Sequence, residues 1–186
     1  MVSLAAFVVI TSVVAFAANR YRPDAWFRSL AKPRWNPPDW LFAPMWTVLY
    51  IGIAVAGSLA WRSAKGWWSM PLTLWAIQLV ANGMWTWLFF GRHRIRAALI
   101  DICVVLVAIV AFIVGTYDDT PEAALLFVPY LVWIAFATVL NAVIWTRNQG
   151  RTRNRGRRGN RARIGNPAPT RNPIPTGHRP GVRAHR

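Results

Sequence analysis

The sequence predicts an all-α membrane protein, a bundle of five transmembrane helices followed by a disordered, arginine-rich C-terminal tail. Three observations lead to this fold class. Of the 186 residues, 55% are hydrophobic and 12 are tryptophan. The apolar residues gather in five stretches, and most of the net charge of +16 lies near the C-terminus. This composition differs from that of an ordinary soluble domain.

The charge divides the chain into two predicted domains. Residues 1–146 carry 10 Lys and Arg against all 6 Asp and Glu, and we expect them to form the transmembrane domain. Residues 147–186 carry 12 Arg, no acid and no Trp, Phe or Tyr. Because this tail cannot bury enough apolar surface to fold, we expect it to be disordered.

The composition also excludes several kinds of site. One cysteine, Cys103, cannot form an internal disulfide, and with His93 as the only histidine of residues 1–146 it cannot supply a zinc site. Nucleotide-binding and hydrolase motifs such as GxGxxG, GxxxxGK[ST], GxSxG and HExxH are absent from the sequence. We therefore predict no metal ligand and no required cofactor.

The five apolar stretches are each long enough to cross a membrane, because about 20 helical residues span a hydrocarbon core of about 30 Å. Lipid offers no hydrogen-bond partners to the backbone, so the spans must be helices. The first is short, and its alternative is a signal peptide, since Ala15-Phe16-Ala17 resembles a cleavage site. No Lys or Arg precedes its apolar run, which favours a span. The predicted spans are residues 2–18, 42–61, 67–90, 97–116 and 122–146.

The distribution of Lys and Arg predicts the orientation of the bundle. With five spans, the first loop (19–41), the third loop (91–96) and the tail lie on one side and carry 20 Lys and Arg, against 2 on the other side. The positive-inside rule places these three segments in the cytoplasm and the N-terminus on the opposite side.

The third span carries polar and aromatic residues on one face. The spacings of 3, 4, 3 and 4 residues put them in one stripe, which must face protein rather than lipid. A pocket wall and simple helix packing both explain the stripe, and the two are compatible. The stripe consists of Trp75, Gln78, Asn82, Trp85 and Phe89.

Two other spans repeat this pattern. Small alanines beside large indoles would leave a flat slot, which suits a planar apolar macrocycle stacked on aromatic faces, and we expect Trp46 and Trp133 to stack on it. No His or Cys lies on these faces, so a macrocycle without a metal fits better than one held through a metal ion. The residues concerned are Ala43, Trp46 and Tyr50 in the second span and Tyr130, Trp133, Ala137 and Asn141 in the fifth.

The most unusual stretch is KPRWNPPDWLFAPMWTVLY, residues 32–50, with four prolines and three tryptophans. Proline restricts the backbone and tryptophan adds rigid surface, so we expect an ordered lid; an interfacial aromatic belt is the alternative. Lys32 and Arg34 place two cations in this stretch. The predicted lid residues are Lys32, Arg34, Trp35, Pro37, Pro38 and Trp40.

This stretch, KPxWxPPxWxFxPxWxxLY, resembles the signature of the TspO/MBR family, the tryptophan-rich sensory proteins related to the mitochondrial translocator, or peripheral benzodiazepine receptor. The similarity covers about residues 5–148. It continues through Gln78-x3-Asn82-x2-Trp85, Phe89-Phe90-Gly91, Ala98-Leu99-Ile100-Asp101 and Pro129-Tyr130-x2-Trp133-x2-Phe136-Ala137-Thr138-x-Leu140-Asn141.

The resemblance implies a five-helix bundle, commonly a homodimer, with a pocket beneath the first loop and a place in a bacterial cytoplasmic membrane. It implies binding of porphyrins such as protoporphyrin IX, and the lack of a His or Cys ligand favours a metal-free porphyrin over haem. Lys32 and Arg34 are placed to meet the porphyrin propionates. Some members also bind cholesterol or benzodiazepine-type and isoquinoline ligands. The ligand contacts that it implies are Ala43, Met45, Trp46, Asn82, Trp85, Trp133, Ala137 and Leu140, to which we add Tyr50 from the slot.

Two departures from the family pattern limit what is carried over. Ala142 stands where the sterol motif of the fifth helix has tyrosine, so sterol binding through that motif is not expected. Ala97 stands where animal members have a tryptophan that contacts drugs, so high drug affinity is not expected either.

The leading functional hypothesis is a membrane sensor or carrier that binds tetrapyrroles, rather than an enzyme. The alternatives are an enzyme that degrades porphyrin in light and oxygen to a bilin-like product, with Trp46 and Trp133 taking part, and a structural scaffold. For the tail, anionic membrane lipid is the expected partner, and a signal that only fixes topology is the alternative. Its lack of aromatic residues argues against nucleic acid.

Asp101 is the only acid well inside a predicted span. A carboxylate in the membrane is costly and is a functional candidate by default. Its nearness to Arg94 and Arg96 favours a structural role with Arg94 or water as the partner.

Overall fold

The computed structural model of the protein describes residues 2–21, 23–64 and 69–164. The chain divides into two compact units, Met1–Gln149 and Gly150–Arg186. Every regular element in the described residues is a helix, which confirms the all-α class. The boundary between residues 146 and 147 stays a prediction.

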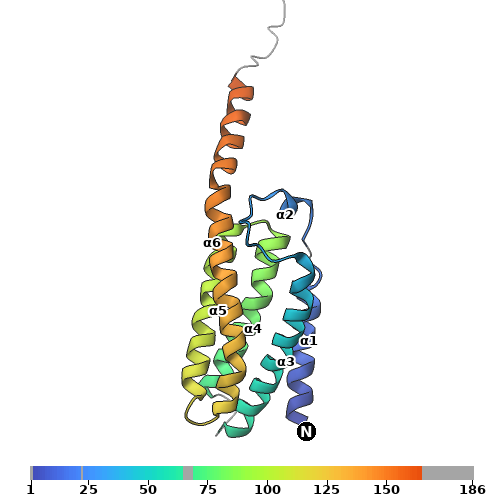
Figure 1. Ribbon diagram of the computed structural model, residues 1–186, viewed down its shortest axis with the longest axis vertical. Coiled ribbons are helices and arrows are strands. Elements are labelled where there is room, and N and C mark those ends of the chain that lie inside the picture. Colours follow the sequence, from blue (N-terminus) through green and yellow to red (C-terminus); the bar gives the residue numbers. More distant parts are fainter. Residues whose placement is uncertain (1, 22, 65–68, 165–186) are drawn as a thin grey trace, which may run out of the picture. The chain divides into compact units, whose positions relative to one another are not determined.

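All five predicted spans are helical over their described residues, except that Ser69 of the third span is the N-cap of α4 (Figure 1). A short helix in the first loop, α2, was not predicted. The elements are α1 (Val2–Ala18), α2 (Ala25–Ser29), α3 (Asp39–Ser63), α4 (Met70–Thr86), the π-helix η1 (Trp87–Gly91), α5 (Ile95–Thr116) and α6 (Pro121–Ile164).

Local sequence explains where the helices of the first loop begin. The carboxylate of Asp24 accepts a hydrogen bond of 3.0 Å from the backbone N–H of Phe27 and so caps α2. Helix α3 begins at Asp39, three residues before the predicted start, directly after Pro38. An acidic residue in the first turn favours this start, because it complements the helix dipole.

The helices differ in how well they match the thickness of a membrane. Three segments are long and apolar enough to cross it: Asp39–Ser63, Ile95–Thr116 and Pro121–Gln149. The apolar part of α1, Leu4–Ala18, is shorter, and α4 has 17 residues before η1 extends it to Gly91. These lengths and compositions fit a membrane protein, and the crossing of α1 and α4 stays a prediction.

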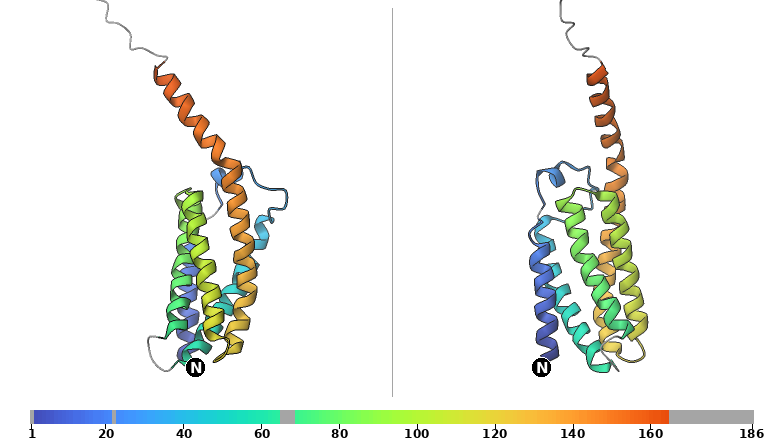
Figure 2. Two further views of the ribbon diagram at one scale, coloured as in Figure 1. Left: turned by 90° about the vertical axis from the view of Figure 1, so that its left-hand side faces the viewer. Right: turned by 180° about the vertical axis from the view of Figure 1, so that it is seen from behind.

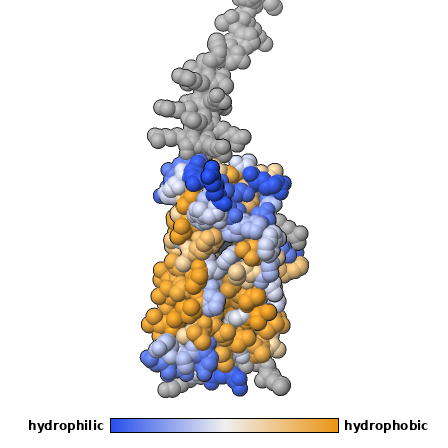
Figure 3. Space-filling model, in the orientation of Figure 1, coloured by the Kyte–Doolittle hydropathy of each residue, from blue (hydrophilic) through white to orange (hydrophobic). Residues whose placement is uncertain are grey.

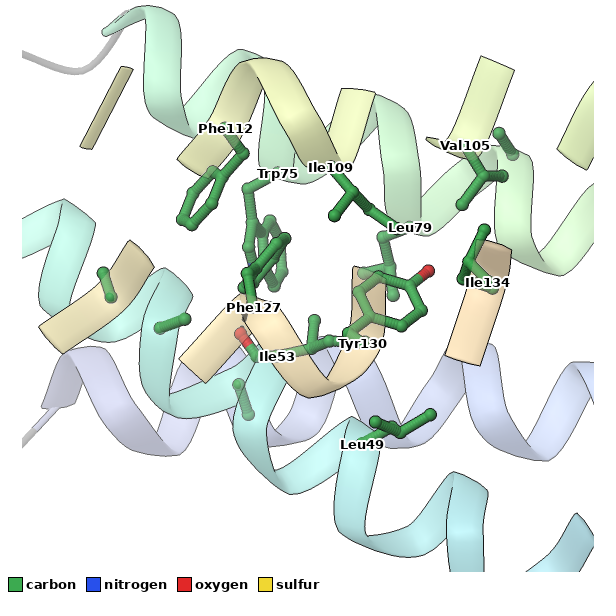
Figure 4. Close-up of a cluster of buried hydrophobic side chains, with 14 of the residues drawn as sticks. Leu49, Ile53, Trp75, Leu79, Val105, Ile109, Phe112, Phe127, Tyr130 and Ile134 are labelled. Atoms are coloured by element: carbon green, nitrogen blue, oxygen red, sulfur yellow. Dashed lines mark hydrogen bonds between the residues drawn. The ribbon is translucent and has the colours of Figure 1, made fainter. Parts of the chain in front are cut away.

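Helix α4 packs against α1, α3 and α5, and α1 also packs against α3 (Figure 2). Between α5 and α6, the rings of Phe112 and Phe127 stack with centroids 4.0 Å apart (Figure 4). Both rings are fully buried. This stack fixes the register of the two antiparallel helices.

A close approach of α1, α3 and α4 depends on Gly57. A Cβ atom at this position would lie 2.5 Å from Nε1 of Trp75 and 2.6 Å from the ring of Phe7. The same Nε1 donates a hydrogen bond of 2.8 Å to the carbonyl oxygen of Ile53. Only glycine therefore lets the indole approach α3 this closely and donate its N–H there.

The loops gather at the two ends of the first unit as the alternating spans predict (Figure 1). At one end, His93 of the third loop contacts Asp24 of the first, and Asn148 near the end of this unit contacts Ala31. At the other end, the hydroxyls of Ser63 and Thr120 are 2.7 Å apart. On the face in Figure 3, polar residues lie toward both ends of an apolar band.

The backbone after residue 146 differs from the predicted disorder, because α6 continues to Ile164. Extending an existing helix costs far less than starting one, and arginine is a good helix former. These two factors outweigh the absence of an apolar face. Residues 165–186 of the predicted disordered tail lie outside the described residues.

Candidate functional site

A small pocket lies among α3, α4, α5 and α6. Its cavity volume is about 20 Å³. That is room for about one water. The empty space around it, which includes the open mouth, is about 330 Å³. The lining residues are Phe42 and Trp46 from α3, Asn82 and Trp85 from α4, Ile102 and Val105 from α5, and Trp133, Ile134 and Ala137 from α6.

The aromatic rings of the pocket are held by further rings. Trp46 has its centroid 5.5 Å from Tyr50 and 6.4 Å from Tyr130. Trp133 lies 5.8 Å from Phe42 in an edge-on arrangement. Such pairs restrict the orientation of each ring, so the indoles form preformed walls.

Trp85 forms the wall contributed by α4 and stacks on Phe89, with centroids 5.3 Å apart and planes inclined by 23°. Its Nε1 is buried and has no hydrogen-bond partner among the described residues. A buried unpaired donor costs about 1–3 kcal/mol. This wall therefore offers a donor that water or a ligand could satisfy.

A chain of hydrogen bonds joins three helices beside the pocket. The hydroxyl of Tyr50 donates to Oδ1 of Asn82 at 3.3 Å. Nδ2 of Asn82 donates to the hydroxyl of Tyr130 at 2.7 Å, and that hydroxyl donates to Oε1 of Gln78 at 3.0 Å. Asn82, Gln78 and Tyr130 are buried. The network fixes Asn82, the polar residue of the pocket wall, through both ends of its amide.

The polar and aromatic stripe predicted for the third span is confirmed. Trp75, Gln78, Asn82 and Phe89 are buried, and Trp85 is half-buried against the core. The two functions weighed for the stripe are both present, since Gln78 and Asn82 bond to other helices while Asn82 and Trp85 line the pocket.

The structure brings together five of the predicted ligand contacts as lining residues: Trp46, Asn82, Trp85, Trp133 and Ala137. Tyr50 lies one hydrogen bond behind this wall, on Asn82. The other three lie elsewhere, Met45 against the main core, Leu140 in a separate apolar cluster with Phe27 and Phe89, and Ala43 exposed.

The position of Ala43 follows from the helical turn. Phe42 and Trp46 are four residues apart and share the face of α3 that lines the pocket, while residue 43 is rotated by about 100° from residue 42. Ala43 therefore lies outside the slot that it was expected to form with Ala137. The small residue that lines the pocket is Ala137.

Four lining residues were missed from the sequence. Phe42 had a usable signal, its spacing of four from Trp46. Ile102, Val105 and Ile134 had none, because aliphatic residues in a membrane span look alike whether they face a pocket, another helix or lipid.

The first loop is attached to α6 near the end of the first unit. The side-chain amide of Asn148 accepts from the backbone N–H of Ala31 at 3.1 Å and donates to its carbonyl at 3.2 Å. Nη1 of Arg147 donates to the carbonyl of Lys32 at 3.2 Å. The first loop is therefore ordered where it meets α6.

Some of the predicted lid residues pack near the pocket, and others are exposed to solvent. Trp35 is 5.6 Å from Phe136, which packs on Trp133 of the pocket. Pro37 is buried, whereas Arg34 and Pro38 are exposed and Trp40 is 71% exposed. Nζ of Lys32 lies 3.9 Å from the centroid of the Phe27 ring. Of the two cations that were expected to meet a propionate, Lys32 therefore packs on an aromatic ring, whereas Arg34 is exposed to solvent.

A contact between the first and third loops was not foreseen. His93, which has a positive φ of 54°, stacks on Trp26 at 4.1 Å, and its Nε2 lies 3.1 Å from Oδ2 of Asp24. The N–H of Phe27 and then the charge of His93 hold the pKa of Asp24 below its ordinary value of 3.8. The two loops are thus joined at the charged end of the unit.

Asp101 does not form the contact with Arg94 that was weighed for it. It is buried, and its Oδ2 has no hydrogen-bond partner among the described residues. Both polar side-chain atoms of Asn141 are likewise buried without a hydrogen-bond partner among the described residues. The structural role of Asp101 with water as its partner stays a prediction.

The described residues contain no group of three His, Cys, Asp or Glu placed to hold a metal ion. Cys103 is exposed on α5. The arrangement offers aromatic faces, one amide and one unpaired indole N–H in a narrow apolar pocket. These groups can bind a planar apolar molecule and orient its polar edge.

Comparison with known proteins extends over most of the chain. The model of the TspO/MBR family matches residues 2–146. The chain is 36% identical over 151 residues to the translocator protein of Sus scrofa, covering 78% of this chain and 89% of that protein. It is 38% identical over 149 residues to the tryptophan-rich protein TspO of Chlorobaculum tepidum (77% and 94%) and 35% identical over 153 residues to that of Archaeoglobus fulgidus (80% and 98%).

Proposed function

The chain belongs to the TspO/MBR family of membrane proteins, and on this basis we propose that it is a membrane sensor or carrier that binds a tetrapyrrole such as protoporphyrin IX. The observation that carries the proposal is the convergence of three indoles, those of Trp46, Trp85 and Trp133, from three helices on one pocket. The names of its relatives, translocator and sensory proteins, favour binding over catalysis.

The proposal includes the placement of the bundle in the membrane. Helix α1 and the segment α4–η1 cross the bilayer together with the three longer spans. The first loop, the third loop and the C-terminus lie in the cytoplasm of a bacterium, because these segments carry most of the Lys and Arg. We also propose a homodimer and a tail that lies on anionic lipid.

The macrocycle would lie between Trp46 and Trp133, with Asn82 and Nε1 of Trp85 toward its polar atoms. Space for about one water does not admit such a ring. The pocket must therefore widen, and the first loop is the element whose departure would open it, because Trp35 packs on Phe136 next to Trp133. Arg34 would meet a propionate at the mouth, exposed to water and so contributing little.

The experiment is a titration of the purified protein with protoporphyrin IX in detergent, followed by tryptophan quenching. We expect saturable binding that is lost in Trp133→Ala and retained in Trp40→Ala, the matched control, since Trp40 is exposed. Equal effects of the two substitutions would argue against the pocket. Absence of saturable quenching in the unaltered protein would reject tetrapyrrole binding and leave a scaffold.

Illumination of the complex tests the enzymatic alternative. A binding protein leaves the porphyrin absorption band as stable as that of free porphyrin in the same detergent. Faster loss of the band with a new product, dependent on Trp46 and Trp133, would replace the carrier by an enzyme that degrades porphyrin.

A further inference from the structure

A second site candidate lies outside the pocket, where the end of α1 meets η1. The ring of Tyr21 packs directly on Gly91, where a Cβ atom would come within 2.8 Å of the ring. About two turns earlier along both helices, Val14 lies against Gly83 on the same seam. Glycine at both positions lets α1 approach the helix closely, and the backbones of Arg20 and Arg92 each lie one residue from the Tyr21–Gly91 contact.

The π-helix determines where the side chain of Arg92 lies. The N–H of Arg92 donates to the carbonyl of Trp87, five residues earlier, at 2.8 Å. In an α-helix, residues five apart point in different directions, but a π-turn brings them over one another. The guanidinium carbon of Arg92 consequently lies 5.5 Å from the centroid of the Trp87 ring. Such turns are rare and frequent at functional sites.

A second arginine is held in a similar way on α1. The guanidinium carbon of Arg20 lies 5.7 Å from the centroid of the Phe16 ring. Both distances are those of cation–π contacts, which hold the side chains without neutralising them. Within the described residues, no carboxylate lies within ion-pair distance of either guanidinium, since Asp24 is paired with His93. Two arginines beside one helix contact thus keep their charge available.

The aromatic residues place these arginines at the edge of the apolar surface. Phe16 is 68% exposed, and Tyr21 and Trp87 are each 37% exposed. Aromatic side chains of this kind occupy the membrane–water interface, with the headgroups at the level of the arginines. The ligand in reach at that depth is the phosphate of a membrane lipid.

We propose that Arg20 and Arg92 bind the headgroup phosphate of an anionic phospholipid at the α1–η1 seam, with its acyl chains against the exposed aromatic rings. Guanidinium groups donate to phosphate oxygens in charge-assisted hydrogen bonds. An anionic lipid is favoured over a zwitterionic one, because the quaternary ammonium group of phosphatidylcholine would be repelled by the same two arginines. This site is independent of the tetrapyrrole pocket.

The test uses full-length protein in detergent and native mass spectrometry with phosphatidylglycerol and with phosphatidylcholine of the same acyl chains. Arg20→Gln/Arg92→Gln is compared with Arg28→Gln/Arg94→Gln, which removes the same charge at the same end. The tail contributes equally to all the proteins. If each bound arginine raises the affinity for phosphatidylglycerol about fivefold, Arg20→Gln/Arg92→Gln should lower that affinity about 25-fold. The control variant Arg28→Gln/Arg94→Gln should lower it less than twofold.

Trp87→Leu provides a variant that keeps every charge. It removes the ring beneath Arg92, and we expect it to weaken phosphatidylglycerol binding severalfold without changing the weak binding of phosphatidylcholine. Thermal unfolding of each variant shows that the fold is retained, as expected for exposed side chains.

Three results would overturn the proposal. Equal weakening by the two arginine pairs would show that charge acts diffusely. Equal affinity of the unaltered protein for the two lipids would remove the headgroup preference. Displacement of phosphatidylglycerol by millimolar inorganic phosphate would show a site for a free anion rather than for a lipid.

Discussion

The side-chain amide of Asn148 pairs with both backbone polar atoms of Ala31, a residue 117 positions earlier in the chain. A third hydrogen bond of 2.7 Å ties the same amide to the carbonyl of Ile144 in its own helix. Asn148 therefore supplies two of the hydrogen bonds that hold the first loop over the bundle, and their contribution can be measured.

We predict that Asn148→Ala releases the first loop. The substitution leaves the N–H and the carbonyl of Ala31 without these partners, at a cost of about 1–3 kcal/mol. Hydrogen exchange in residues 19–38 should accelerate while exchange in α4 and α5 stays unchanged. Thr146→Ala, two residues earlier in α6 at a side chain bonded to its own helix through Val143, is the control; equal acceleration there would contradict the role of Asn148.

Tyr130→Phe should destabilise the bundle more than Tyr50→Phe. The first change leaves Nδ2 of Asn82 and Oε1 of Gln78 unpaired in a buried position, at about 1–3 kcal/mol, whereas the second removes one terminal bond of 3.3 Å. Thermal unfolding in detergent measures the difference, with exposed Tyr117→Phe as the reference. The same midpoint for Tyr130→Phe and Tyr117→Phe would show that the network adds nothing to stability.

Gly57→Ala should destabilise the bundle by about 1–3 kcal/mol or more through overpacking. The new methyl group would displace Trp75 and Phe7, and the bond from Trp75 to Ile53 would be lost with it. At Gly115 a Cβ atom meets nothing within 4 Å, so Gly115→Ala should be neutral or slightly stabilising. Thermal unfolding midpoints of the two variants measure the difference. An unchanged midpoint in Gly57→Ala would mean that α1 and α3 can move apart at little cost in free energy.

Ala137→Leu should abolish tetrapyrrole binding without unfolding the protein. A leucine side chain there fills the narrow pocket and keeps every aromatic wall. Ala43→Leu makes the same change on the exposed side of α3 and should bind normally. Quenching titrations compare the two, and loss of binding in Ala43→Leu alone would reverse the assignment of the two alanines.

The contact between the loops should weaken only in acid. The pKa of Asp24 is lowered in the folded state by the N–H of Phe27 and by His93, so its contribution is fully present above the ordinary value of 3.8 and is lost as the pH falls through the lower, folded value. The protection factors of the α2 amides, in which the pH dependence of intrinsic exchange is divided out, should therefore fall as the pH drops below about 4. Asp24→Asn, which keeps a capping side chain, should remove this acid step; a step that persists in the variant would exclude Asp24.

The features that could be predicted from the sequence are those whose evidence lies within a single helix. Polar residues are so costly in a membrane span that the stripe from Trp75 to Phe89 could face only protein, and its spacing fixed the face. The pocket residues Trp46 and Trp133 were likewise found from aromatic spacing.

The rest depends on contacts between distant segments. The pairing of Asn148 with Ala31 and the stack of His93 on Trp26 join residues far apart in the chain, and no local propensity encodes them. The π-turn at Trp87–Gly91 differs from an α-helix by one residue per turn, which composition does not reveal. Ala43 was misplaced because neither its small size beside Trp46 nor the family motif gives the rotation of the helix about its axis.

The narrowness of the pocket has a thermodynamic consequence for any ligand of macrocycle size. Because the described conformation has room for about one water, such a ligand binds only a wider conformer, and its apparent dissociation constant is the intrinsic one divided by the fraction of wide molecules. A change that alters only this fraction shifts the affinity for all large ligands by one common factor. A change in the walls alters each ligand's affinity differently, so the pattern across ligands separates gating from recognition.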